Sequence, residues 1–267
     1  MTDAANSTGD EIVLLDYDGA VATVTINRPR KLNALNQAVM VRLDQVVAEL
    51  EGRADVRVVL IKGAGDRAFV AGADISELRE LDRASALAFS RSGGAVLRRL
   101  ERLPQAVVAV VDGFALGGGC ELALACDMVI ASDKARFGLP EVTLGVIPGF
   151  GGTQRLARVA GANNARFWAM GGAIHSAEDA LRIGLVQQVV AAEALTETAA
   201  KLAKTIAARG PLGVAAVKKV IDTGLDEALD AGLESEAQAF AALFESEDRV
   251  EGTTAFLEKR KPAFTGR

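Results

Sequence analysis

The sequence predicts an α/β fold that ends in an all-helical C-terminal region. Short β-branched apolar runs alternate with one-faced helical patterns up to about residue 193, which is typical of βαβ units. From Ala194 onward the chain is rich in Ala, Leu, Glu and Lys and shows no strand pattern. We therefore expect three segments: a disordered tail over residues 1–10, an α/β core over 11–193 and a helical region over 194–267.

The composition is that of a globular domain, with 50% hydrophobic and 24% charged residues. The longest apolar runs fall short of the ~18 residues that a membrane span needs, and the first ten residues lack the basic and apolar regions of a signal peptide. A net charge of −5 argues against nucleic acid or an anionic membrane as the main partner. Cys120 and Cys126 would lie about 9 Å apart on one helix at ~1.5 Å per residue, beyond disulfide reach. We therefore expect a cytoplasmic protein.

The chain opens with a predicted hairpin and a helix. Strands are expected over residues 12–15 and 20–26, and the Asp18-Gly19 pair between them is a hairpin signal. Pro29 ends the pairing, because proline has no N–H to donate to a ladder. Residues 36–51 then carry apolar side chains on one face at helical spacing.

Residues 63–68 match the G-x-G-x-x-A pattern of dinucleotide-binding loops, directly after a buried strand expected over 56–62. That pattern binds a dinucleotide only where a helix opens at the glycines. Residues 69–73 instead read as extended chain. We therefore interpret the match as coincidental.

The α/β alternation continues to residue 190. A helix is expected over 85–103, where Pro104 ends it, and an extended piece over 135–140 leads to Glu141. We place Glu141 on a loop, since Pro140 favours extended geometry in the residue before it. The other expected elements are strands over 107–111, 128–132 and 185–190, a glycine-rich loop over 145–152, and helices over 153–160, 163–170 and 176–183.

The most informative stretch is Gly117-Gly118-Gly119, where an apolar strand runs straight into a helix. Glycines let another molecule approach the main chain closely, and the first N–H groups of a helix have no partner within it. Such donors suit an anion or a developing oxyanion. Glu121 lies on the same helix face as Gly118, which suggests a catalytic layout. The alternative is that the glycines only allow tight packing and that Glu121 is a solvated first-turn acid.

Several other chemistries lack their residues. His175 is the only histidine and no G-x-S-x-G occurs, which argues against a Ser-His-Asp hydrolase. One histidine and two unpaired cysteines do not supply a usual zinc site, so we expect no metal. We interpret His175 as a capping or surface residue, and Cys120 as a small buried core residue rather than a nucleophile. Glu121 and Glu141 remain, and a carboxylate pair beside glycine-rich backbone suits acid–base chemistry next to a polarised carbonyl.

Three sequence blocks resemble the signature blocks of the enoyl-CoA hydratase (crotonase) family, in the family's order and spacing. They are FVAGADI at 69–75, GFALGGGCEL at 113–122, and FGLPE at 137–141 with GFGGTQRL at 149–156. The likeness runs from the opening hairpin to FLEKRKP at 256–262. It implies a crotonase-like spiral of ββα units with a helical C-terminal region, and a homotrimer or a homohexamer assembled through that region.

The resemblance also implies residue roles. The backbone N–H groups of Ala73 and Gly118 would form an oxyanion hole for a thioester oxygen. Glu121 would activate a water that adds to the β-carbon of a trans-2-enoyl-CoA, and Glu141 would exchange a proton with the α-carbon. The remaining implied contacts are Ala71, Asp74 and Ile75 in the CoA crevice, Arg30, Lys31 and Leu32 near the nucleotide end, and Gly149 near the catalytic water. For Arg30 and Lys31, solvated loop charge is the alternative.

Relatives in this family catalyse several reactions on one scaffold. Because both glutamates are present, the implied reaction is reversible hydration of an enoyl-CoA to a 3-hydroxyacyl-CoA in fatty acid β-oxidation or related acyl-CoA metabolism. The partner is the acyl-CoA substrate itself, and no separate cofactor is expected. The alternatives are an enoyl-CoA isomerase or another CoA-thioester enzyme of the family, and a non-catalytic RNA-binding relative.

Overall fold

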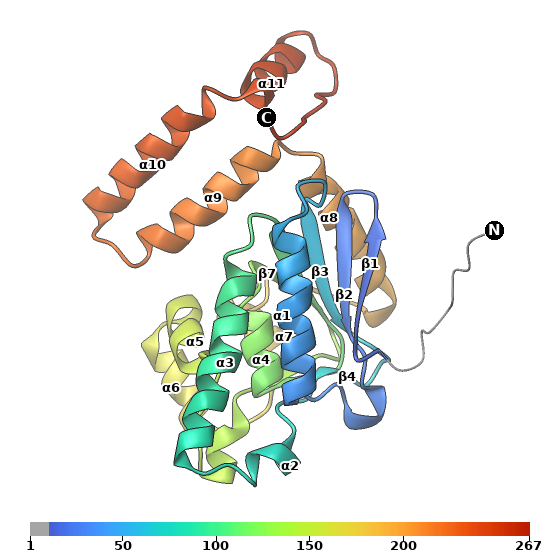
Figure 1. The fold of residues 1–267 in the computed structure, drawn as a ribbon, viewed down its shortest axis with the longest axis vertical. Helices are drawn as coiled ribbons and strands as arrows, with labels where there is room; N and C mark the ends of the chain where they lie inside the picture. Colours follow the sequence, from blue (N-terminus) through green and yellow to red (C-terminus); the bar gives the residue numbers. More distant parts are fainter. Residues whose placement is uncertain (1–10) are drawn as a thin grey trace, which may run out of the picture.

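The computed structural model describes residues 11–267, and the tail expected over residues 1–10 lies outside the described part. A six-stranded sheet in the order β1-β2-β3-β5-β7-β10 forms the body of the molecule (Figure 1). β1 runs antiparallel to β2, and every other neighbouring pair is parallel. The strands are β1 (Val13–Asp18), β2 (Val21–Ile26), β3 (Val58–Gly63), β5 (Ala106–Val111), β7 (Met128–Ser132) and β10 (Gln188–Val190).

The opening hairpin is confirmed, with a shift in its turn. The ladder continues from Val13 opposite Ile26 to Asp18 opposite Val21, so β1 extends beyond the expected residues 12–15. Gly19 takes up the reversal with a φ of +57°, a conformation that glycine adopts without steric cost.

Both faces of the parallel sheet are buried, which explains its uninterrupted apolar strands. On β5, Val107 and Ala109 face the main core, which also contains buried side chains of α1 (Gln37–Glu51) and α3 (Arg83–Glu101). Val108 faces the opposite side and packs in a second cluster with Leu195 and Ala199 of α8 (Leu195–Ala207). The alternation of side chains along a strand therefore divides one apolar run between two cores.

A second, four-stranded sheet was not among the expected elements. It has the order β4-β6-β8-β9, from β4 (Ala68–Val70), β6 (Phe114–Leu116), β8 (Arg136–Gly138) and β9 (His175–Ser176). Its first three strands follow β3, β5 and β7 along the chain, and each pair of strands is followed by one or more helices. The fold is thus the α/β spiral of ββα units that the family resemblance implied. The glycines at 63–68 lead into β4, so extended chain follows them as expected.

Most of the expected helices are present, and three details differ. Pro140 and Glu141 begin a 3-10 helix, η2 (Pro140–Leu144), rather than lying on a loop, because proline suits the first position of a helix. Cys126 lies beyond the end of α4 (Gly118–Leu124). The strand expected over 185–190 is shorter in the structure, where β10 covers only Gln188–Val190. The remaining elements before α8 are η1 (Pro29–Lys31), α2 (Ile75–Leu78), α5 (Gly152–Ala160), α6 (Ala162–Gly171), α7 (Ala177–Arg182) and η3 (Ala192–Ala194).

The C-terminal region is helical, as the composition indicates. α8 covers the sheet, whereas α9 (Pro211–Gly224) and α10 (Leu229–Leu243) form an antiparallel hairpin that extends away from it, followed by α11 (Glu247–Leu257) (Figure 1). Three apolar side chains on α10 are more than half exposed, Leu229, Leu233 and Phe240, and Phe244 at the C-terminal end of the helix is half exposed. In residues 11–267, no helix combines the length and the apolar character needed to cross a membrane.

Candidate active site

The glycine stretch brings the two glutamates into one place. Gly117 joins β6 to α4 with φ +50° and ψ −121°, a backbone conformation open to glycine. Its N–H donates to the Gly138 carbonyl over 2.9 Å, which ties the start of α4 to the end of β8. Because Glu141 follows Gly138 closely in the sequence, this contact sets its carboxyl group beside α4. A Cβ on Gly117 would lie 2.9 Å from Oε1 of Glu141.

Glu121 is buried, with only 1% of its surface exposed. This contradicts the alternative of a solvated first-turn acid. Its Oε1 accepts two backbone hydrogen bonds of 2.7 Å, from the N–H groups of Phe150 and Gly152. Burial raises the pKa of Glu121, and the two N–H donors oppose that rise by stabilising the charged carboxylate.

Glu141 has a different environment. Its Oε2 is buried and has no hydrogen-bond partner among residues 11–267. Burial raises the pKa of Glu141 from 4.5 to about 7, and the nearby charge of Glu121 adds to the rise. When two neighbouring carboxyl groups have unlike environments, one can stay charged and act as a base while the other stays neutral and acts as an acid.

The segment around Ala73 presents a free backbone donor. Leu35 donates its N–H to Gly72 and accepts a hydrogen bond from Asp74, both over 2.8 Å. In this parallel pairing the N–H of Ala73 points away from Leu35, and no acceptor for it lies within residues 11–267. A Cβ on Gly118 would lie 3.6 Å from the Ala73 nitrogen, so the first turn of α4 is adjacent to this donor.

These groups open into one cavity of about 660 Å³. It brings together the four expected catalytic residues, Glu121, Glu141, Ala73 and Gly118, with three of the expected binding residues, Ala71, Ile75 and Gly149. The rest of its wall comes mainly from α2, α3 and the segment 140–150, and includes Leu78, Phe89, Ser90, Leu144, Ile147 and Phe150.

The other expected binding residues lie outside the lining of this cavity. Arg30 and Lys31 are exposed on η1, and Leu32 follows them with a φ of +50°. Asp74 caps α2 by accepting from the Ser76 N–H, and it pairs with Arg28 at 3.2 Å. Binding roles for these four residues remain predictions.

The structure also shows where Cys120 and His175 lie. Cys120 is a fully buried core residue whose pKa burial raises, which confirms its structural interpretation. His175 does not cap a helix: Ser176 caps α7, and the His175 ring stacks on Trp168 with centroids 4.1 Å apart. Within residues 11–267, no cluster of three or more His, Cys, Asp and Glu side chains could hold a metal ion.

Sequence reasoning missed the donors to Glu121. Phe150 and Gly152 lie 29 and 31 residues further along the chain, and no local spacing connects them to α4. The glycine-rich GFGG run was the available signal, since closely spaced glycines often mark main chain that approaches another group.

Comparison with known proteins identifies the family of this chain. The model of the enoyl-CoA hydratase/isomerase family matches residues 16–267. The chain is 47% identical over 249 residues to a short-chain-enoyl-CoA hydratase of Clostridium acetobutylicum, covering 93% of this chain and 95% of that protein. It is 42% identical over 254 residues to a crotonyl-CoA hydratase of Syntrophomonas wolfei, covering 95% and 98%.

A crystal structure of an enoyl-CoA hydratase from Bacillus anthracis has the same fold, with a TM-score of 0.93 at 39% identity, covering 96% of this chain and 100% of that one. Fold, sequence blocks and full-length relatives thus agree. This chain belongs to the enoyl-CoA hydratase/isomerase (crotonase) family.

Proposed function

We propose that this protein is an enoyl-CoA hydratase, which adds water reversibly across the 2-trans double bond of an enoyl-CoA to give a 3-hydroxyacyl-CoA. The observation that carries the proposal is the pair Glu121 and Glu141, which line one cavity in unlike environments together with Ala73 and Gly118. Hydration forms a bond to oxygen and a bond to hydrogen, so it has a use for both carboxyl groups. The hydratase names of the full-length relatives support the same reaction.

In the proposed mechanism the thioester carbonyl oxygen accepts hydrogen bonds from the N–H groups of Ala73 and Gly118. Negative charge grows on this oxygen as the double bond is attacked and enolate character develops. Donors that are fixed in advance, in a cavity with little water, stabilise that charge more than solvent does.

Glu121 in its charged form takes a proton from the water, whose hydroxyl then bonds to the β-carbon. Glu141 in its neutral form gives its proton to the α-carbon. The reverse reaction exchanges these roles. The N–H groups of Phe150 and Gly152 favour the charged form of Glu121, and the partnerless burial of Glu141 favours its neutral form.

For the CoA part of the substrate, we propose contacts from Ala71, Asp74 and Ile75 in the crevice, with Gly149 near the water. Arg30, Lys31 and Leu32 would meet the nucleotide end, and the exposed cations of η1 suit its phosphates. Replacing both Arg30 and Lys31 with Ala should raise KM for the CoA ester and leave kcat nearly unchanged.

We also propose a homotrimer or homohexamer that assembles through residues 194–267, and a cytoplasmic location. The exposed apolar side chains of α10 support the assembly, because a monomer rarely leaves such a row in water. Both cysteines are free thiols, which fits a reducing compartment.

The test of function is incubation of the purified protein with crotonyl-CoA and, separately, with a 3-enoyl-CoA, followed by product analysis. Crotonyl-CoA is the first choice because a relative is named for it. Formation of 3-hydroxybutyryl-CoA supports hydration. Conversion of the 3-enoyl ester to the 2-enoyl ester without hydration would identify an isomerase instead. An inert protein that binds RNA would point to the non-catalytic reading.

A further inference from the structure

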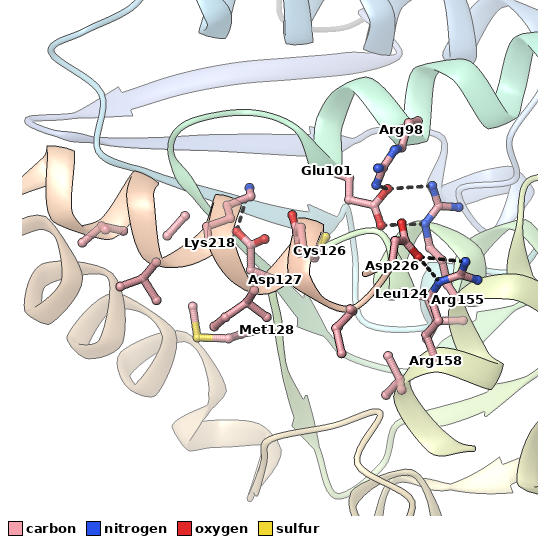
Figure 2. Close-up of a pocket in the computed structure, with 17 residues that line it drawn as sticks. Arg98, Glu101, Leu124, Cys126, Asp127, Met128, Arg155, Arg158, Lys218 and Asp226 are labelled. Carbon is pink, nitrogen blue, oxygen red and sulfur yellow. Dashed lines mark hydrogen bonds and ion pairs between the residues drawn. The ribbon is translucent and has the colours of Figure 1, made fainter. Parts of the chain in front are cut away.

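A row of charged side chains connects α3 with α5 through hydrogen bonds. Figure 2 shows Arg98, Glu101 and Arg155 in contact along the wall of a second cavity, of about 440 Å³, between the core and α9. We propose that Arg155, locked by Glu101, is a positioning residue that holds the 150–152 turn so that its two N–H groups point at Glu121. This inference rests on the proposed function, because it assumes that Glu121 is catalytic.

Arg155 contacts the 150–152 turn directly. Nη1 of Arg155 donates to the Phe150 carbonyl over 2.8 Å. That carbonyl belongs to the peptide joining Phe150 to Gly151, so it lies between the two N–H groups that bind Glu121. Fixing its direction fixes the orientation of the whole turn. Gly151 has a φ of +104°, and a Cβ there would clash with Nη1 of Arg155, so the turn is built closely around the guanidinium.

Glu101 in turn fixes the side chain of Arg155. Nε and Nη2 of Arg155 donate to the two carboxylate oxygens of Glu101, each over 3.1 Å. The side chains of this pair are only 12% and 20% exposed. Nη1 of Arg98 donates to the same carboxylate over 2.8 Å. A two-pronged, partly buried contact of this kind fixes a guanidinium in both position and plane.

Arg155 and Glu101 lie outside the lining of the substrate cavity, which contains Glu121 and Glu141, and line the second cavity instead. A change in either residue can therefore reach the reaction only through the turn or through its charge. Gly152, one of the two donors, is also the first residue of α5, the helix that carries Arg155. The Glu101 contact thus holds the start of α5 against the end of α3.

The test uses crotonyl-CoA hydration by the full-length protein. In Arg155→Met and Glu101→Gln we expect kcat to fall by roughly 10- to 100-fold, since a displacement of about 1 Å is enough for such an effect, with KM within about twofold of the parent value. Arg158→Met is the matched control. Arg158 lies on the same helix and pairs with Asp226 at 3.2 Å, but both side chains are more than half exposed, so kcat should not change.

Arg155→Lys separates geometry from charge. Lysine keeps the positive charge but cannot make the paired hydrogen bonds to Glu101 and also donate to the Phe150 carbonyl. The charged groups facing Glu121 are Arg155 from α5 and Glu141 from η2. Burial raises the pKa of Glu121, and the positive charge of Arg155 opposes that rise, which favours the charged form that acts as the base. Loss of that charge should therefore move the acidic limb of the pH profile of kcat to higher pH. Lysine should return that limb to its parent position while kcat stays low.

Folded Arg155→Met with the parent kcat and an unmoved acidic limb would overturn the inference. If Arg155→Met does not fold, the kcat values of Glu101→Gln and Arg155→Lys replace it as the test, and parent kcat values in both would overturn the inference. Glu121→Gln is measured in parallel. If Glu121→Gln keeps its rate, the assignment of Glu121 fails. If Glu121→Gln is inactive and the Arg155 and Glu101 variants keep theirs, only the positioning role fails.

Discussion

The backbone N–H of Phe150 donates a 2.7 Å hydrogen bond to Oε1 of Glu121, across 29 residues of sequence. Together with the Gly152 N–H it gives one carboxyl group of the site two fixed donors. The other, on Glu141, keeps a buried oxygen with no partner among the described residues. The difference in donors is the physical basis for assigning the base to Glu121 and the acid to Glu141.

The first prediction concerns stability and pH. Between pH 4.5 and about 7 the unfolded chain has lost the proton of Glu141 while the folded protein keeps it, so folding becomes less favourable as pH rises through this window. The penalty is complete above about pH 7 and absent below 4.5. Glu141→Gln cannot ionise, and the site gives Oε2 no hydrogen bond to lose. Its Tm should equal the parent value at pH 4.5 and exceed it at pH 8.5. The increase should be ~2–4 °C for each kcal/mol by which the ionisation of Glu141 lowers the free energy of unfolding. Equal melting temperatures at both pH values would contradict this.

The second prediction concerns the oxyanion hole. Gly118→Ala adds a methyl group 3.6 Å from the Ala73 nitrogen, where it crowds the proposed position of the thioester oxygen. We expect kcat to fall about tenfold or more, because a small displacement of the reacting carbonyl is costly. The nearest side-chain atom, Cδ1 of Leu35 at 3.3 Å, can move aside, so the protein should stay folded. Gly94→Ala on α3 is the control, since nothing lies within 4 Å of its added methyl and its rate should match the parent.

The third prediction concerns assembly. Leu233 and Phe240 are 53% and 64% exposed on one side of α10. Replacing both with Glu should convert the oligomer into monomer in sedimentation velocity, since it puts charge into an apolar contact. Gln238→Glu, on another side of the same helix, adds charge without removing apolar surface and should leave the oligomer intact. A parent protein that sediments as a monomer at every concentration would contradict the proposed assembly.

The elements with strong local signals could be predicted from the sequence. The buried run that became β5 and the helices expected over 153–160 and 176–183 appear in the structure close to their expected bounds. The second sheet could not be predicted, because its three- and two-residue strands are too short to show a period of two.

In the candidate site, too, some features could be predicted from the sequence and others could not. Gly118 and Glu121 could be recognised because a strand, a glycine run and a carboxylate lie next to one another in the sequence. The burial of Glu121 and its donors could not, because they depend on contacts between α4 and a turn that arrives from far along the chain. Only the family resemblance placed Ala73 beside Gly118, because its N–H is left free by a pairing with Leu35 that no local pattern reveals.

The most direct test of the account is the hydration rate of crotonyl-CoA by Glu121→Gln, Glu141→Gln and the double variant, with thermal melts to confirm folding. Each single change keeps the shape and removes acid–base capacity, so each should lower kcat by roughly 10² to 10⁴-fold. Because the two groups act together in one addition of water to the double bond, the double variant should lose much less than the product of the single losses. A well-folded single variant that retains most of its hydration rate would contradict the assignment of the pair.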